Sequence, residues 1–377
     1  MTRPLVALDI GSTKVACAIG LPRERAPGFE LLGSSLVPYP SLAESWWSDP
    51  LTVGRTIEQA LEATAVSGDF DRALVSVNSP SLTSEQVQAT CHLADEPLTV
   101  RAQDLERLQR RALDQALGVD REPLLIERLG CTGNGFEGVR DPLGLSAMRL
   151  SGTFHIVAMP ISLRRAVVQA VESAGLDVAH LAYTLPSAMA SATDENLGQR
   201  RILCLDIGGI STDVGIFVEG VLRKVQVIPW GGLRLATDIA RELQATMDQA
   251  LAWSLEGSAC RKPAVRSIVQ QQWQVLRQAM ETLLKDEPQL DAALLCGRGA
   301  LMDGLAEWIE RTSGLTASIC RSARTQHLGD LSRQVGLSAP IGMLEISTRL
   351  SADGSLRDPH LFNRLIDRTR TLLTEYF

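Results

Sequence analysis

Two stretches of the chain share one pattern of hydrophobic and polar positions. Each has an apolar run, the triplet Asp-Ile-Gly, small hydroxyl residues and a second apolar run: LVALDIGSTKVACAI begins at residue 5, and ILCLDIGGISTDVGIFV begins at residue 202. Short apolar runs interrupted by glycine predict two buried strands joined as a hairpin. Because Asp9 and Asp206 occupy the same place in the two copies, the pattern predicts two related halves of one molecule.

Elsewhere the chain alternates short apolar runs with stretches of helical periodicity. The runs predict strands at 73–77, 124–129, 154–158, 225–229 and 292–295; the helical period predicts helices at 52–65, 99–118, 162–175, 185–192, 236–253 and 265–284, and one more to residue 312 after CGRGALMDGL. Segment 21–50, rich in Pro, Ser and Gly, is expected to form loops and short edge strands, with Trp46 and Trp47 packed over a core edge. This alternation indicates an α/β fold of layered lobes.

The tips of the two hairpins carry the residue types that bind phosphate. Turn amides hold phosphate oxygens, hydroxyls add donors, and Asp9 and Asp206 can hold a hydrated Mg²⁺ against them. Lys14, placed opposite Asp213 of the second copy, is expected to reach the β- and γ-phosphates. Two glycines before a predicted helix can also approach a phosphate. The predicted phosphate-binding residues are Asp9, Gly11, Ser12, Thr13, Lys14, Asp206, Gly208, Gly209, Ser211, Thr212, Gly231 and Gly232.

Composition limits the remaining possibilities. A chain of 377 residues exceeds one ordinary core, so two or more lobes are expected. The net charge of −7 argues against non-specific nucleic-acid binding, because that affinity comes mainly from Lys and Arg. None of the seven cysteines forms a CxxC pair, which favours reduced core thiols in a cytosolic protein. We expect a soluble body, since the start of the chain leaves no room for a signal peptide and no apolar run approaches the ~20 residues of a membrane span.

The last 27 residues have a different pattern. A polar segment containing Gly and Pro, 351–360, reads as a linker, and a helix with one apolar face is predicted at 361–377. Such a helix can dock on the body of the protein or lie in a membrane interface, and its polar face carries three Arg against one Asp and one Glu. The apolar face consists of Leu361, Phe362, Leu365, Ile366, Leu372, Leu373, Tyr376 and Phe377.

Over nearly its whole length the chain resembles FtsA, the actin-like cell-division protein of bacteria. LDIGSTKVACAIG resembles the first phosphate loop of that family, TDENLGQRRILCLDIGGISTDVGIF the second, and GVRDPLGLSAMRLSGTFHIV the end of its inserted subdomain. IPWGGLRLATDIA resembles its glycine-helix motif, LLCGRGALMDGL its adenosine-side loop, and the terminal helix its membrane-targeting helix. By this resemblance, Gly297, Arg298 and Gly299 lie on the adenosine side of the site.

The resemblance implies a two-lobed actin-like α/β fold with ATP and Mg²⁺ between the lobes. It also implies filament formation, other division proteins as partners, tethering of the FtsZ C-terminal peptide to an anionic membrane surface, and a place at the division site on the cytoplasmic face of the membrane. The expected division is 1–82, first lobe; 83–160, inserted α+β subdomain with subunit contacts; 161–195, first-lobe helices; 196–235, second lobe; 236–290, lower second lobe and partner binding; 291–350, second lobe and return to the first; 351–360, linker; 361–377, membrane helix.

Several positions depart from the family pattern. Leu185 stands where related ATPases have a glutamate that orients the attacking water, which a leucine cannot do. Ile210 replaces a glycine near the phosphates, Arg298 replaces the middle glycine of the adenosine loop, and Ala250 and Trp253 align with a Glu and a Lys that touch the nucleoside. These changes predict a nucleotide site with weak or absent ATPase activity. No catalytic residue is assigned.

Two other functions of the same fold remain open at this point. A small-molecule kinase would need a catalytic Asp with a substrate pocket in the first lobe, and no such group of residues is evident. A pilus-assembly adaptor similar to PilM would bind the tail of a partner. The terminal amphipathic helix and the stretch TDENLG favour the division adaptor.

Overall fold

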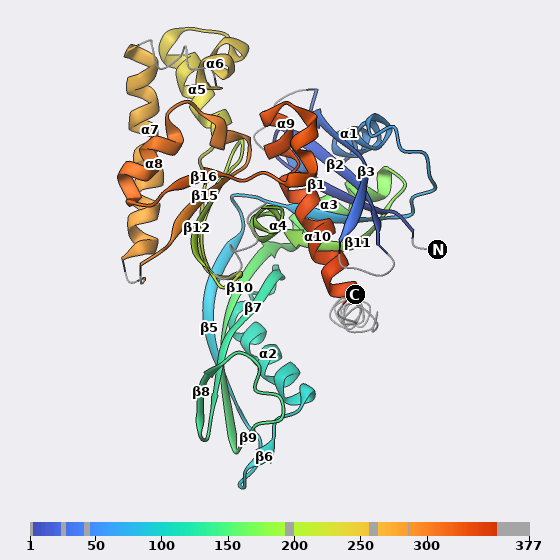
Figure 1. The fold of residues 1–377 in the computed structure, drawn as a ribbon, viewed down its shortest axis with the longest axis vertical. Coiled ribbons are helices and arrows are strands. Elements are labelled where there is room, and N and C mark those ends of the chain that lie inside the picture. Colours follow the sequence, from blue (N-terminus) through green and yellow to red (C-terminus); the bar gives the residue numbers. More distant parts are fainter. Residues whose placement is uncertain are drawn as a thin grey trace.

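The computed structural model describes residues 3–23, 28–40, 46–192, 200–255, 263–285, 287 and 289–352. Within these residues the fold is α/β, with two lobes that carry sheets of the same topology and a third, elongated body that extends from them (Figure 1). The predicted terminal helix, most of the predicted linker and the TDENLG stretch lie outside the described residues.

The first lobe is built on a five-stranded sheet in the order β11-β4-β1-β2-β3. Antiparallel pairing joins β1 to β2 and β2 to β3, while β4 and β11 add in parallel on the other side of β1. The central strands are buried on both faces, which explains why their sequences are apolar throughout. The strands span Leu5–Ile10 (β1), Lys14–Pro22 (β2), Phe29–Pro38 (β3), Arg72–Val77 (β4) and Asp177–Tyr183 (β11).

The second lobe repeats this topology with β14-β13-β12-β15-β16. Here β12 and β13 form the hairpin, β14 extends it antiparallel, and β15 and β16 add in parallel on the other side of β12. The same four strand pairings in two sheets confirm the prediction of two related halves. The strands span Arg201–Ile207 (β12), Thr212–Val218 (β13), Val221–Ile228 (β14), Ala292–Cys296 (β15) and Ala317–Ile319 (β16).

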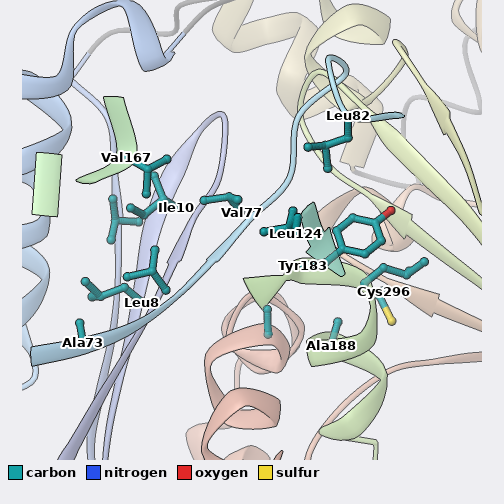
Figure 2. Close-up of a cluster of buried hydrophobic side chains, with 14 of the residues drawn as sticks. Leu8, Ile10, Ala73, Val77, Leu82, Leu124, Val167, Tyr183, Ala188 and Cys296 are labelled. Atoms are coloured by element: carbon teal, nitrogen blue, oxygen red, sulfur yellow. The ribbon is translucent and has the colours of Figure 1, made fainter. Parts of the chain in front are cut away.

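Helices cover both sheets, and one core runs between the lobes. In Figure 2 this core continues from Leu8 and Ile10 of β1, through Tyr183 and Ala188, to Cys296 of β15. Helix α4 therefore connects the two lobes through buried apolar contacts. The helices are α1 (Pro50–Ala63), α3 (Ile161–Ser173), α4 (Thr184–Ala190), α5 (Gly232–Leu243), α6 (Met247–Leu255), α7 (Pro263–Leu284), α8 (Leu305–Ser313), α9 (Leu331–Gly336) and α10 (Ser338–Ala352), with 3₁₀ turns η1 (Trp46–Ser48), η4 (Arg298–Leu301) and η5 (Ala323–Leu328).

Between β4 and α3 the chain forms a separate body with its own core. Its sheet has the order β5-β10-β7-β8, and helix α2 packs on one face through Leu105, Leu108 and Ala112. At the base of this body, buried His155 bridges Ser84 and the backbone oxygen of Leu222 in β14. The elements are β5 (Thr83–His92), β6 (Leu98–Thr99), α2 (Ala102–Ala116), β7 (Arg121–Gly133), β8 (Phe136–Val139), β9 (Ser146–Ala147) and β10 (Arg149–Pro160).

Three expectations for the elements are corrected. The helix predicted at 236–253 is two helices, because Gln244 adopts a left-handed conformation (φ 51°) that ends α5. The segment 21–50 contains a ten-residue strand, β3, in addition to loops. Helix α10 extends to Ala352, so the first two residues of the predicted linker are helical. Trp47 packs against the main core as expected.

Two further sequence expectations concern membrane-spanning helices and the cysteine thiols. No described helix combines the length and the apolar character that crossing a bilayer requires. The cysteines in the described part of the chain, six in all, are free and buried, as predicted for core thiols.

Candidate functional site

The two hairpin tips face each other and touch. A Cβ on Gly209 would lie 2.6 Å from Ser12 Oγ and 2.6 Å from Thr13 Cγ2, so the tip of the second hairpin approaches the first as closely as a glycine allows. The two loops therefore meet at one site between the lobes, as the repeat predicts.

This site opens into a cleft of about 320 Å³. That volume lies within the range of small-molecule sites, about 300–1,000 Å³. The structure brings together at the cleft all but two of the predicted phosphate-binding and adenosine-side residues: Asp9, Gly11, Ser12, Thr13, Lys14, Asp206, Gly208, Gly209, Ser211, Gly232, Gly297, Arg298 and Gly299.

The hairpin turns leave backbone amides available. Each loop closes with one hydrogen bond, from Gly11 N to Lys14 O and from Gly208 N to Ser211 O, both about 3 Å long. Within the described residues, the N–H groups of the four tip residues donate to no protein acceptor. Four free amides and three hydroxyls around one space form an anion-binding arrangement. The four tip residues are Ser12, Thr13, Gly209 and Ile210, and the hydroxyls belong to Ser12, Thr13 and Ser211.

The strand register corrects one equivalence between the two copies. Ile10 pairs with Val15 as Ile207 pairs with Thr212, so the two loops have the same length. The counterpart of Lys14 is therefore Ser211, and the expectation that Lys14 corresponds to Asp213 is wrong. The hydroxyl residues misled the alignment because Ser211 and Thr212 stand two places later in the second copy than Ser12 and Thr13 do in the first.

Asp9 is fixed by three donors around its carboxylate. Lys14 Nζ lies 3.3 Å from Oδ2, while Ser76 Oγ donates to Oδ1 at 2.9 Å and Thr184 Oγ1 at 3.4 Å. Lys14 also donates to the backbone oxygen of Gly336 at 3.3 Å. The ammonium thus lies at the cleft wall, where it faces both a carboxylate and the space between the hairpins.

Asp206 lies across the cleft from Asp9 in a less favourable setting for charge. Burial raises the pKa of Asp206 to about 7, and the Asp9 carboxylate adds to this rise while Lys14 opposes it. Near neutral pH this carboxyl is therefore divided between its acid and its ionised form. A cation placed between the two aspartates would favour the ionised form.

Two predicted phosphate residues, Thr212 and Gly231, do not line the cleft. Thr212 is fully buried and donates to the backbone oxygen of Trp230 at 2.8 Å. A Cβ on Gly231 would lie 2.5 Å from Gly208 O, so this glycine lets α5 pack against the second loop. The first amides of α5 are also used there, because Gly232 and Leu233 donate to Gly208 O and Gly209 O. Both positions support the loop from behind, and only Gly232 of the glycine pair reaches the cleft.

The predicted adenosine loop lines the cleft beside the second hairpin. Gly297 and Gly299 abut Ile207, and Arg298 reaches across to α9, where its Nε donates to Ser332 Oγ at 3.1 Å. The assignment of Ala250 and Trp253 to nucleoside contacts is wrong by one residue. Ala250 is buried in the core of the second lobe, whereas Leu251 and Ser254, one position later, line the cleft.

Several residues at the cleft were missed. Asn78 follows the carboxyl end of β4, and the rule that ligands bind beyond the carboxyl ends of parallel strands could have found it. Thr184 begins α4, directly before the predicted helix. The α9–α10 junction contributes residues from the distant end of the chain, for which no local signal exists. The missed residues are Pro38, Asn78, Thr184, Ala188, Leu233, Met302, Val335, Gly336, Ser338 and Ala339.

A buried hydrogen bond joins the two lobes beneath the hairpin tips. Tyr183, at the end of β11, donates to Asp213 Oδ2 of β13 at 2.6 Å. Burial raises the pKa of Asp213 well above its ordinary value, and the Tyr183 hydroxyl opposes that rise. The bond therefore stabilises the arrangement of one lobe against the other.

Replacing Tyr183 with phenylalanine is expected to lower the free energy of unfolding by about 1–3 kcal/mol, because the buried carboxyl loses its donor. Thermal and urea unfolding would measure the loss. Tyr39→Phe is the matched control: the Tyr39 hydroxyl is buried without a partner in the described part of the chain, so removing it should cost nothing. Equal melting temperatures for Tyr183→Phe and Tyr39→Phe would contradict the role of the bond.

Comparison with known proteins identifies the family of this chain. The family model described as "Cell division protein FtsA" matches residues 203–359, and the one described as "SHS2 domain inserted in FTSA" matches residues 80–158. The chain belongs to the FtsA family. The second match coincides with the separate body between β4 and α3, which is therefore the inserted domain of an FtsA protein.

Curated FtsA proteins agree with this assignment. FtsA of Pseudomonas aeruginosa is 28% identical over 65% of this chain and 59% of its own length, and FtsA of Escherichia coli K12 is 24% identical over 63% and 56%. The aligned part thus spans less than two thirds of these relatives.

Solved structures identify the fold. A PilM-PilN type IV pilus biogenesis complex aligns with 92% of this chain and 99% of its own, with a TM-score of 0.70 at 15% identity. MreB5 of Spiroplasma citri bound to AMPPNP aligns with 94% and 100%, with a TM-score of 0.52 at 13% identity. The fold of this FtsA-family chain is actin-like.

The departures from the FtsA pattern occupy different places in the structure. Ile210 and Arg298 line the cleft, so both add side chains to the site. Leu185 is fully buried and packs against Gly215 of β13, outside the cleft lining. Among the described lining residues the only carboxylates are Asp9 and Asp206. No glutamate lines the cleft to substitute for the one that Leu185 replaces in the pattern of related ATPases.

Proposed function

We propose that this protein is an actin-like adaptor of bacterial cell division, which binds Mg-ATP, assembles into filaments and tethers FtsZ polymers to the cytoplasmic membrane. The observation that carries the proposal is the pair of Asp-Ile-Gly hairpins, whose tips meet over one cleft with free amides, hydroxyls and two aspartates. Membership of the FtsA family supplies the cellular role.

The cleft residues fit a magnesium nucleotide. The amides of Ser12, Thr13, Gly209 and Ile210 would hold phosphate oxygens, with Lys14 as the cation. No group of three or more ligand-type side chains among the described residues could hold a metal by itself. Mg²⁺ would therefore be held by phosphate and water, with Asp9 and Asp206 binding its water ligands. The AMPPNP that MreB5 binds in the same fold supports this assignment.

Hydrolysis is expected to be weak or absent. A water attacking the terminal phosphate needs a group that orients it and accepts its proton. The described cleft offers Asp9, whose carboxylate is held by three donors, and Asp206, assigned to the hydrated cation. We therefore propose that nucleotide closes the lobes into a polymer-competent shape, which is a population shift without a required chemical cycle.

The partners follow from the family role. Residues 83–160 would make subunit contacts in a filament, residues 236–290 would bind the FtsZ C-terminal peptide, and other division proteins would join at the septum. The apolar face predicted at 361–377 would insert into an anionic membrane surface on its cytoplasmic side. A filament presents many such segments, so a weak single contact becomes a strong one.

Sedimentation with liposomes that contain anionic lipid tests the adaptor. The full chain with Mg-ATP is expected to pellet with the vesicles, and Phe362→Glu should reduce the bound fraction at least tenfold, because a charge enters the predicted apolar face. Asn363→Glu adds the same charge on the predicted polar face and should bind nearly as the wild type does. Equal binding by Phe362→Glu and the wild type would remove the membrane role from the proposal.

The pilus-adaptor alternative has less support. The likeness to the PilM-PilN complex is structural at 15% identity and shows the fold alone, whereas both family models name FtsA.

A further inference from the structure

Arg298 joins the two lobes beside the cleft. It stands on η4, and Met302, which ends that turn, belongs to the core of the second lobe. Its Nε donates to Ser332 Oγ of α9 at 3.1 Å. Helix α9 is part of the first lobe, since a Cβ on its last residue, Gly336, would meet Leu36 of β3. The bond from Arg298 to Ser332 therefore connects one lobe with the other, and we call it the arginine clasp.

The clasp can open more easily than the buried bond between the lobes. Tyr183 and Asp213 are both buried, so their bond breaks only if both groups lose their partner inside the core. Arg298 and Ser332 are both half-buried. When they separate, water can take the place of either partner, and the net loss of free energy is small. The lobes can thus part at the clasp without opening a core.

The terminal nitrogens of Arg298 are available for a ligand. Nη1 and Nη2 have no protein acceptor in the described part of the chain. The other cation of the described cleft lining, Lys14, is paired with Asp9 at 3.3 Å. A guanidinium binds phosphate oxygens through two parallel donors, and its charge strengthens both bonds. Arg298 is therefore a second cation for the phosphates, and it has no carboxylate partner among the described residues.

Arg298 also lies next to the groups that would hold the phosphates. It follows Gly297, and a Cβ on that glycine would lie 2.5 Å from Asp206 Oδ1. Farther along the side chain, Arg298 Cδ would lie 3.7 Å from a Cβ on Gly336, whose backbone oxygen accepts from Lys14. The side chain thus extends from the residue beside Asp206 to the residue that accepts from Lys14. This course places it beside the expected phosphate chain.

We propose that Arg298 binds the phosphate chain through its terminal nitrogens while Nε holds Ser332, so that the clasp closes the lobes over the nucleotide and slows its exchange. The inference rests on the proposed function, in that a Mg-nucleotide must occupy the cleft. It gives a role to an arginine that stands where the family pattern has a glycine. With weak or absent hydrolysis, release is the step that ends the closed state, and the clasp sets how long that state lasts. Ser332 is a positioning residue.

Stopped-flow fluorescence of the full chain with Mg-ATP that carries a methylanthraniloyl group measures entry and release separately. Ser332→Ala removes the clasp and keeps the guanidinium. We expect both rate constants to rise about three- to tenfold, in the range of one hydrogen bond, while the Kd changes by less than about twofold. A faster rate in both directions distinguishes a clasp from an ordinary ligand contact, whose loss speeds release alone.

Variants of Arg298 test the phosphate contact. Arg298→Met keeps the length of the side chain, and its Kd for Mg-ATP should rise about tenfold, as expected for a lost charge-assisted hydrogen bond. Arg298→Lys restores a cation without the fork, so it should recover most of the affinity but not the slow exchange. Adding Ser332→Ala to Arg298→Met should change nothing further, because Ser332 acts through Arg298. Arg333→Met, an exposed change on the same helix, is the matched control.

The outcomes separate the inference from the proposed function. Entry and release in Ser332→Ala that equal those of Arg333→Met overturn the clasp, and an unchanged Kd in Arg298→Met overturns the phosphate contact. Either result leaves a nucleotide-binding adaptor in place. A folded wild-type protein that binds no Mg-ATP at millimolar concentration overturns both the inference and the proposed function. Thermal unfolding without nucleotide shows that each variant is folded.

Discussion

Gly342→Ala is expected to destabilise the protein strongly. A Cβ on Gly342 would overlap the backbone oxygen of Ser187 and would lie 2.7 Å from its carbonyl carbon. These are backbone atoms of α4, which no rotamer change can move. Neighbouring residues of α10, Ile341 and Leu344, are fully buried against the first sheet, so α10 cannot shift away without opening that core. The expected loss is about 3–5 kcal/mol of unfolding free energy.

Thermal unfolding followed by circular dichroism would measure this loss. Gly118→Ala is the matched control, because Gly118 is exposed and its new Cβ would meet only the Asp120 carboxylate tip, which can rotate away. The control should melt within about a degree of the wild type, since exposed substitutions usually change stability by less than about 0.5 kcal/mol. If Gly342→Ala had the same melting temperature as Gly118→Ala, the crossing of α10 and α4 would be shown to accommodate a methyl group.

The contact at Gly342 also explains how the site is held together. Helix α4 begins with Thr184, a donor to Asp9, and α10 follows Gly336, an acceptor from Lys14. The close crossing of these two helices thus fixes partners on both sides of the Asp9–Lys14 pair. A small residue far from the hairpin tips is therefore expected to influence nucleotide binding through the backbone.

The sequence identified the hairpins because their signal is local. Strands buried on both faces must be apolar throughout. In addition, the same short motif, an aspartate beside a glycine turn, occurs twice in the sequence. The related topology of the two sheets follows from that repeat. In contrast, Thr184 and the α9–α10 junction reach the cleft only through tertiary packing. Their roles could not be read from neighbouring residues.

The division between α5 and α6 was within reach of the sequence. Thr246 and Gln249 form reciprocal hydrogen bonds, from Thr246 N to Gln249 Oε1 and from Gln249 N to Thr246 Oγ1. This is the capping box, a Ser or Thr followed three residues later by Glu or Gln, which starts a new helix. Continuous apolar periodicity across 236–253 concealed it.

Asp206→Asn is expected to lower the affinity for Mg-nucleotide on the order of 100-fold at pH 8, with Asp114→Asn, an exposed change of the same chemistry, leaving it unaltered. The reason is the loss of one of the two carboxylates that would hold the hydrated cation in the proposed function. The pH dependence is the sharper test. The pKa of Asp206 is about 7 in the folded protein, so below that pH the acid form predominates and cannot bind the cation. Wild-type affinity should therefore rise between pH 6 and 8, and the rise should be smaller in Asp206→Asn.

Without nucleotide, the free energy of unfolding should fall as the pH rises, whereas the affinity for nucleotide should increase. The folded pKa of Asp206 is raised from 3.8 to about 7, so the native state binds more protons than the unfolded state across that window. Stability is therefore lost as the pH rises through it, because the buried carboxyl must ionise. Asp206→Asn removes this cost, and the variant should be at least as stable as the wild type at pH 8 while binding far less Mg-nucleotide. A variant that lost both stability and affinity would show that Asp206 serves the fold, and a wild-type affinity that stayed flat from pH 6 to 8 would show that its ionisation is not linked to the cation.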